Sequence, residues 1–83
     1  MPKIDQILWS HTKGDLLYCL CRSGKQYVFS YCQILNGGAI FSYLCEDGFF
    51  VSQKQESFSS IYFDTLDQIV IAIKQYYENF GNV

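Results

Sequence analysis

Apolar residues gather in short blocks along most of the chain, and each block has a strand-like character. Residues 15–22 contain the run Leu16 to Cys21, in which both alternating sets of side chains are apolar. A strand of this kind is expected to be covered on both faces. Further blocks rich in aromatic and β-branched residues predict three more strands. They span residues 25–35, 39–45 and 49–53.

Turn residues separate these blocks and predict tight connections between neighbouring strands. Gly24 lies between the first two blocks, Gly37 between the next two, and Gly48 before the last. Glycine tolerates the positive φ that short hairpin turns demand. The order therefore predicts an antiparallel meander in which each strand pairs with the next one.

The segment before the first strand predicts a short helix over residues 2–9. Ile4, Ile7 and Leu8 have helical spacing, and Pro2 stands near the start, where proline is tolerated. Residues 11–14, from His11 onward, predict a loop that leads into the sheet.

The C-terminal segment predicts a longer amphipathic helix whose apolar stripe packs in the core. Asp64 or Thr65 can accept hydrogen bonds from the free amides of the first turn, and Gly81 can close the far end. The apolar residues repeat at intervals of three and four, as one helix face requires. They are Leu66, Ile69, Val70, Ile73, Tyr76, Tyr77 and Phe80.

These elements together predict the α+β class and a single domain over residues 1–83. We expect an antiparallel sheet of about four strands, with a short N-terminal helix and a longer C-terminal helix. Residues 54–60 predict a loop or a ragged edge, and residues 61–63 predict a short additional strand. The two helices are expected to cover the sheet, since a sheet this hydrophobic cannot leave both faces exposed to water.

Composition favours a folded binding protein over several other classes. Apolar and aromatic residues make up 49% of the chain and charged residues 17%, so an intrinsically disordered chain is not expected. Seven Tyr, seven Phe and one Trp are more rings than so small a core can hold, which predicts aromatic surface that meets a protein or peptide partner. The net charge of −2 with scattered basic residues argues against nucleic-acid binding.

The chain carries no pattern that predicts secretion or membrane insertion. No apolar segment follows a basic one at the start, and the longest apolar run is far shorter than the roughly 20 residues that span a bilayer. We therefore expect a soluble cytoplasmic protein that does not contact a membrane. The four cysteines, Cys19, Cys21, Cys32 and Cys45, are expected to be reduced core residues, with a disulfide as the alternative.

Catalytic and cofactor motifs are absent from the sequence. No nucleophile elbow and no phosphate-binding loop occurs, and His11 is the only histidine that could activate a cysteine. Cys19 and Cys21 lack the spacing of zinc ligands and have no second pair to complete a site. We expect no enzyme activity, no metal and no cofactor.

Two segments of the C-terminal half resemble the Src-homology-2 family. Residues 46–52, with the sequence EDGFFVS, match its G-(F/Y)-(F/Y)-(I/V)-S strand. Residues 63–70, with the sequence FDTLDQIV, match the F-x-(T/S)-L-x-x-L-V opening of its second helix. Upstream, residues 26–31 are similar to its Y-x-L-S-V strand and residues 19–23 to its F-L-V-R-x-S strand. Residues 4–9 would form its first helix.

The resemblance implies a degenerate phosphotyrosine-binding module. In that family a buried arginine holds the phosphate of phosphotyrosine, and Arg22 occupies its position here. Ser23 would offer a hydroxyl and an amide beside it, and Lys25 lies in the same short loop. Arg22, Ser23 and Lys25 are therefore the candidate ligand-binding residues. The chain departs from the family in the shortness of this loop before Tyr27, in the missing His-Tyr pair of the next strand and in the missing Trp strand. The alternative is that Arg22 is an exposed residue beside a tight turn.

Two functions of different classes follow from the sequence. The first is a small protein-interaction module that binds phosphotyrosine-type or extended peptides. The second is a stand-alone inhibitor, immunity or assembly protein that acts through an aromatic surface. An exposed strand edge or aromatic patch could also pair two copies as a homodimer. The position of Arg22, in a cavity or on a hairpin tip, distinguishes the two.

Overall fold

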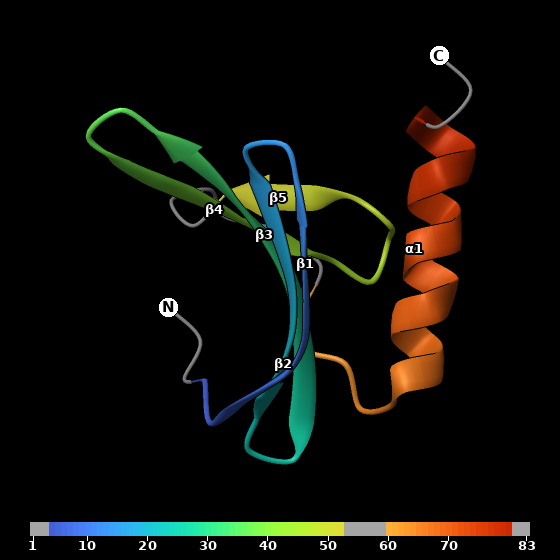
Figure 1. Cartoon of the computed structure of the whole chain (residues 1–83). Helices are drawn as coiled ribbons and strands as arrows, with labels where there is room; N and C mark the ends of the chain where they lie inside the picture. The colour runs from blue at the N-terminus through green and yellow to red at the C-terminus, as the bar shows by residue number, and fades with distance from the viewer. Residues whose placement is uncertain (1–3, 53–59, 81–83) are drawn as a thin grey trace.

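The computed structural model describes residues 4–52 and 60–80 and contains one antiparallel sheet and one helix (Figure 1). The five strands follow one another across the sheet in chain order, β1-β2-β3-β4-β5. Each strand is therefore joined to its neighbour by a hairpin. The elements are β1 Gln6–Lys13, β2 Leu16–Ser23, β3 Gln26–Leu35, β4 Gly38–Leu44, β5 Phe50–Ser52 and α1 Leu66–Phe80.

The expected fold is wrong at its N-terminal end. Residues 2–9 were expected to form a helix, but the chain forms β1 from Gln6 and continues it through His11 to Lys13. The described chain therefore has five strands and one helix in place of about four strands and two helices. Pro2, on which the expected helix start rested, lies outside the described residues.

A β-bulge explains the misleading pattern. The pairing of β1 with β2 shifts between Ile7, which faces Cys21, and Trp9, which faces Leu20. Leu8 is the extra residue, so two apolar residues stand next to each other where a regular strand would alternate. This adjacent pair imitates the spacing of a helical stripe.

Two-residue turns join the first three strands. Lys13 pairs with Leu16 across the first turn, and Ser23 pairs with Gln26 across the second. Gly14 and Gly24 are the first residues of these turns and have φ of +62° and +63°. Glycine at this position with positive φ suits the hairpin turn whose twist matches that of the flanking strands.

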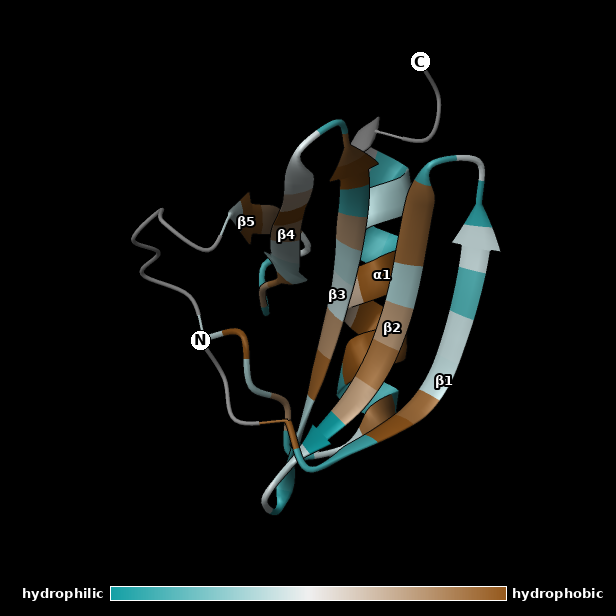
Figure 2. Ribbon diagram, turned by 60° about the vertical axis from the view of Figure 1, so that its left-hand side comes forward, coloured by the Kyte–Doolittle hydropathy of each residue, from teal (hydrophilic) through white to brown (hydrophobic). Residues whose placement is uncertain are grey.

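Helix α1 covers one face of the sheet, opposite β2 and β3, and leaves β1 at the outer edge (Figure 2). Its first turn is capped as expected, because Thr65 Oγ1 accepts a hydrogen bond from the Gln68 amide at 3.3 Å. In turn, the side-chain Oε1 of Gln68 accepts hydrogen bonds from the Thr65 and Asp64 backbone amides. This reciprocal arrangement satisfies amides that the helix itself cannot pair. Gly81, expected to close the helix, lies outside the described residues.

The core between helix and sheet is small and lies toward β3 and β4. Its buried members are Phe29, Leu44, Phe63, Ile69 and Ala72. The stripe of α1 packs only in part, since Leu66, Val70 and Tyr77 remain 44%, 48% and 64% exposed. An apolar flank of the helix is therefore left beside the core.

The turn between β4 and β5 holds α1 against the sheet. Gly48 has φ of +84°, and a Cβ at this position would lie 2.7 Å from Gln75 Cβ and 3.2 Å from the Ala72 carbonyl oxygen. No side chain fits there without moving the helix. The glycine is required both by its backbone conformation and by this close approach.

The segment after β5 agrees only in part with expectation. Residues 53–59, expected as part of a loop, lie outside the described residues. Of the strand expected at 61–63, the structure shows one isolated bridge between Phe63 and Tyr27. Their backbones exchange hydrogen bonds of 2.8 and 2.9 Å, which bring the start of α1 to the sheet. Within residues 4–52 and 60–80, no helix is long and apolar enough to cross a membrane.

Candidate functional site: an aromatic cavity beside an open strand edge

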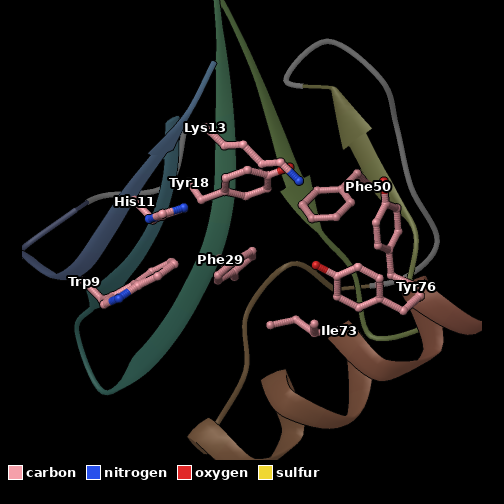
Figure 3. A pocket seen from close by; sticks show the side chains of 9 residues that line it. Trp9, His11, Lys13, Tyr18, Phe29, Phe50, Ile73 and Tyr76 are labelled. Carbon is pink, nitrogen blue, oxygen red and sulfur yellow. The ribbon is translucent and has the colours of Figure 1, made fainter. Parts of the chain in front are cut away.

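A cavity of about 450 Å³ lies between the sheet and α1 (Figure 3). Four strands and the helix contribute to it, and most of its lining is aromatic. The lining residues are Trp9, His11, Lys13, Tyr18, Phe29, Phe50, Ile73, Tyr76 and Tyr77. We refer to it as the aromatic cavity.

Strand alternation brings the three β1 residues to the aromatic cavity. Trp9, His11 and Lys13 are two residues apart, so their side chains share one face of β1. His11 is paired with Tyr18 of β2, and directly paired residues of antiparallel strands also share a face. The three side chains therefore stand beside Tyr18 on the face that α1 covers.

Ring contacts make the sheet side of the cavity continuous. Trp9 stacks on His11 with ring centroids 5.9 Å apart and on Phe29 with centroids 6.4 Å apart. On the other side, the Phe50 and Tyr76 rings meet edge to face at 5.0 Å. Such contacts fix the orientation of large side chains and contribute about 0.5–1.5 kcal/mol per pair beyond area burial. The cavity walls are thus held in place before any ligand arrives.

Tyr18 keeps its phenol protonated inside this site. Burial, followed by the nearby phenols of Tyr76, Tyr77 and Tyr31, raises the pKa of Tyr18 above its usual value of 10.0. At neutral pH the Tyr18 hydroxyl can therefore donate a hydrogen bond as well as accept one.

Lys13 is the one lysine or arginine among the described residues that line the cavity. It is exposed at the end of β1, and Figure 3 shows its amine extending over the cavity toward Phe50. An apolar cavity with one cation at its mouth favours an apolar group that has a carboxylate close by.

β1 is an edge strand, and among residues 4–52 and 60–80 no further strand pairs with its outer side. Antiparallel strands alternate between residue pairs that exchange hydrogen bonds and pairs that do not. The Ile34 amide donates to the Asp15 carbonyl at 3.1 Å, so Asp15 and every second residue after it bond to β3. The backbone of Tyr18 therefore bonds to β1, where its partner is His11.

The same alternation determines which groups of β1 point outward. If His11 bonds to β2, the residues on either side of it do not. The amides and carbonyls of Ser10 and Thr12 therefore face the outer edge, next to the aromatic cavity. Two donors and two acceptors at this spacing are the groups that an added strand would use.

The candidate residues from the sequence lie elsewhere. Arg22 is exposed near the end of β2, with its guanidinium carbon 5.9 Å from the centre of the Tyr27 ring. Ser23 is half-buried beside it, and Lys25 is exposed in the following turn. The structure brings the three together at the β2–β3 hairpin, and none of them lines the aromatic cavity. Their role in binding phosphate stays a prediction.

A second, smaller cavity of about 260 Å³ lies near the start of α1. Its lining combines Glu46 and Asp64 with Tyr62, Gln68 and other residues. The Asp64 carboxylate already accepts a hydrogen bond from the side-chain Nε2 of Gln26 at 3.0 Å. This carboxylate thus has a structural partner, and the cavity offers less apolar surface than the aromatic cavity.

The four cysteines form no disulfide, and the strand register places Cys19, Cys21 and Cys32 on the sheet face opposite α1. Cys21, Cys32 and Cys45 are buried and Cys19 is half-buried. Burial, with a smaller effect of Cys32, raises the pKa of Cys19, and burial with a smaller effect of Cys19 raises that of Cys21. These two thiols are therefore poor nucleophiles at neutral pH. Among the described residues, no three potential ligands are grouped so as to hold a metal ion.

The comparisons with known proteins found no matching family model, no matching curated protein and no matching solved structure. The Src-homology-2 resemblance therefore stays a prediction from the sequence, and the site is interpreted from its own geometry.

Sequence reasoning missed the aromatic cavity because it assigned the β1 residues to a helix and a loop. One pattern could have revealed them: from Trp9 to Lys13, large or basic residues alternate with the small polar residues Ser10 and Thr12. This alternation is typical of a strand.

Proposed function

We propose that the chain is a peptide-binding module whose aromatic cavity accepts an apolar side chain of a protein partner. The observation that carries the proposal is the cavity itself: about 450 Å³, walled by preformed aromatic rings and located beside an unpaired strand edge. This volume lies within the range of roughly 300–1,000 Å³ that ligand sites occupy.

The exposure of the cavity walls supports a macromolecular ligand. Trp9 is 49% exposed and Tyr77 is 64% exposed, although both line the cavity. Large aromatic side chains that stay half in water are typical of surfaces that are covered on binding. A peptide that filled the cavity would cover these two rings as well.

Trp9 supplies a direct test, because it is the only tryptophan of the chain and lines the cavity. The full chain is titrated with a five-residue peptide, acetyl-Ala-Ala-Phe-Ala-Ala-amide, while the Trp9 emission is recorded. We expect a saturable change. The same peptide with glycine in place of phenylalanine should give none.

Two variants locate the binding. Tyr77→Asp places a charge in the cavity wall and should abolish the response. Ile71→Asp is the matched control, since Ile71 is 57% exposed on another flank of α1 and does not line this cavity. Equal responses from both variants, or an equally strong response to N-acetylphenylalanine amide alone, would rule out a peptide site here.

A second candidate function rests on a different surface. The β3–β4 hairpin projects away from α1 (Figure 1) and carries Ile34, Leu35 and Ile40, which are 58%, 45% and 50% exposed. Leu35 is paired with Gly38 and Ile40 with Gln33, so Leu35 and Ile40 are diagonal neighbours on one face of the hairpin. Ile34, which is paired with Ala39, lies on the other face. This patch favours an assembly or inhibitor protein. Leu35→Asp should then abolish partner binding while leaving the Trp9 response intact.

A further inference from the structure

The outer edge of β1 and the aromatic cavity belong to one continuous surface. The backbone groups of Ser10 and Thr12 point outward, while the side chains of Trp9, His11 and Lys13 face the cavity. A segment laid along this edge would therefore make backbone hydrogen bonds and place alternate side chains at the cavity mouth.

We infer that the ligand is an extended acidic peptide segment that adds to β1 as a sixth, antiparallel strand. An aromatic or long apolar residue opposite His11 enters the aromatic cavity, and a carboxylate two residues away faces Lys13. The inference rests on the proposed peptide-binding function and specifies its ligand.

Register places the apolar residue. In an antiparallel pair, directly opposite residues have side chains on the same face. A peptide residue opposite His11 therefore projects toward α1, between Trp9 and Lys13. Its two neighbours lie opposite Ser10 and Thr12, whose outward amides and carbonyls they bond. The next residues on either side face the cavity surface again.

Charge selects an acidic peptide. Lys13 lies at one end of the β1 face that bears Trp9 and His11, and Arg22, with its side chain over Tyr27, stands on the same sheet face at the opposite end of β2. Among the described residues that line the aromatic cavity, none has a carboxylate that could neutralise Lys13. A peptide carboxylate beside Lys13 forms an opposite-charge pair, whereas a basic residue there would be repelled.

Exposure of the whole strand makes this edge accessible. All eight residues of β1 are exposed, although their inner backbone groups are paired with β2. Neither face of the edge needs to open before a peptide binds, so no rearrangement opposes pairing.

The test uses a symmetric probe peptide, acetyl-Glu-Thr-Phe-Thr-Glu-amide, which presents a carboxylate two residues from phenylalanine in both directions. Affinity for the full chain is measured through Trp9 emission and by calorimetry. The comparison peptides are acetyl-Lys-Thr-Phe-Thr-Lys-amide and the acidic peptide methylated on both threonine amides. The acidic peptide should bind best.

Lys13→Glu should weaken binding of the acidic peptide by about tenfold, since a favourable pair becomes a repulsive one. The same variant should bind the lysine peptide more tightly than the unaltered chain does. Lys74→Glu, the same charge change at an exposed position of α1 that does not line the aromatic cavity, is the matched control and should alter affinity by less than about twofold. Equal losses from both variants would contradict a specific role of Lys13.

Methylation of the threonine amides should weaken binding by at least about tenfold, because it removes backbone donors. If methylated and unmethylated peptides bind equally well, and Tyr77→Asp still abolishes both, the cavity binds peptides but the added strand is wrong. If no phenylalanine peptide changes the Trp9 emission, the proposed function fails as well.

A second copy of the chain is the competing occupant of the β1 edge. Sedimentation of the chain without peptide measures this directly, and we expect a monomer. A dimer that the acidic peptide cannot dissociate would assign the edge to self-association and overturn the inference.

Discussion

The two edges of the sheet differ in how closely α1 approaches them. At the β4–β5 turn, the helix lies so near that Gly48 has no space for a Cβ atom. At β1, the helix stands far enough away to leave the aromatic cavity, and every residue of the strand is exposed. A chain of 83 residues can bury only a small core, and here the core lies at the β4–β5 side of the sheet. The comparison indicates that stability depends on β3–β5 and binding on β1.

The largest effect on stability is expected from removing core volume beside α1, which tests whether the core lies at the β4–β5 side. Leu44 has 0% exposure and belongs to the cluster under the helix. Leu44→Ala should lower the free energy of unfolding by about 2–5 kcal/mol, through lost burial and the cavity left behind. Urea unfolding followed by circular dichroism measures this. Ile40→Ala, at a half-exposed position of the same strand, should cost less than about 1 kcal/mol. Similar losses from both would show that the core is not where the structure puts it.

A smaller loss is expected at the tight turn. Gly48→Ala combines a strained backbone, worth roughly 1–2 kcal/mol, with overpacking against Gln75, worth roughly 1–3 kcal/mol. Gly24→Ala has a similar φ of +63° but nothing within 4 Å of the new Cβ. Gly24→Ala should therefore show only the cost of the strained backbone. The difference between the two unfolding free energies isolates the contact with α1, and a difference near zero would contradict it.

At the open edge, Trp9→Ala should cost only about 1–3 kcal/mol of stability, the value of its two ring contacts with His11 and Phe29. The same change should abolish calorimetric binding of the phenylalanine peptides, since it removes a cavity wall. Ile7→Ala alters the same strand on its other face and should preserve binding. A large stability loss for Trp9→Ala would mean that β1 also carries the core.

The smallest effect is a loss of stability at alkaline pH. The folded state raises the pKa of Tyr18 above 10.0 and that of Cys21 above 9.0, mainly by burial. Raised values favour the neutral groups, so their contribution is complete below the unfolded pKa and is lost as pH rises through the folded pKa. The free energy of unfolding should therefore fall above about pH 9. Tyr18→Phe should reduce the part of this fall that occurs above pH 10.0. An unchanged dependence of the unfolding free energy on pH would contradict burial of the phenol.

The sequence predicts the local parts of this fold and misses those that depend on distant pairing. Successive residues of the apolar stripe are three or four positions apart, and the Thr65 cap precedes the first of them directly. Both signals are local, so the start of α1 was predicted correctly. The bulge at Leu8 depends on β2, and without knowledge of that pairing the segment before Trp9 has the spacing of a helix. Tertiary pairing overrides local pattern here.

The candidate site was harder to predict than the fold. Its walls come from positions as far apart as Trp9 and Tyr77, which only the sheet order and the helix bring together. The abundance of aromatic residues indicated that rings would meet a partner, but it gave no position. Arg22 and its neighbours followed from a resemblance, whereas Lys13 lay in what was expected to be a loop.

The bulge at Leu8 also limits what the open edge can grow into. It confines the regular outer backbone of β1 to residues 9–13. Fibrillar stacking of identical strands draws on uninterrupted segments of about six or seven residues. A short peptide fits along the remaining stretch, while a long column of identical strands meets the irregularity in every layer. An exposed, tryptophan-bearing edge can thus remain available for binding without seeding fibrils at high protein concentration.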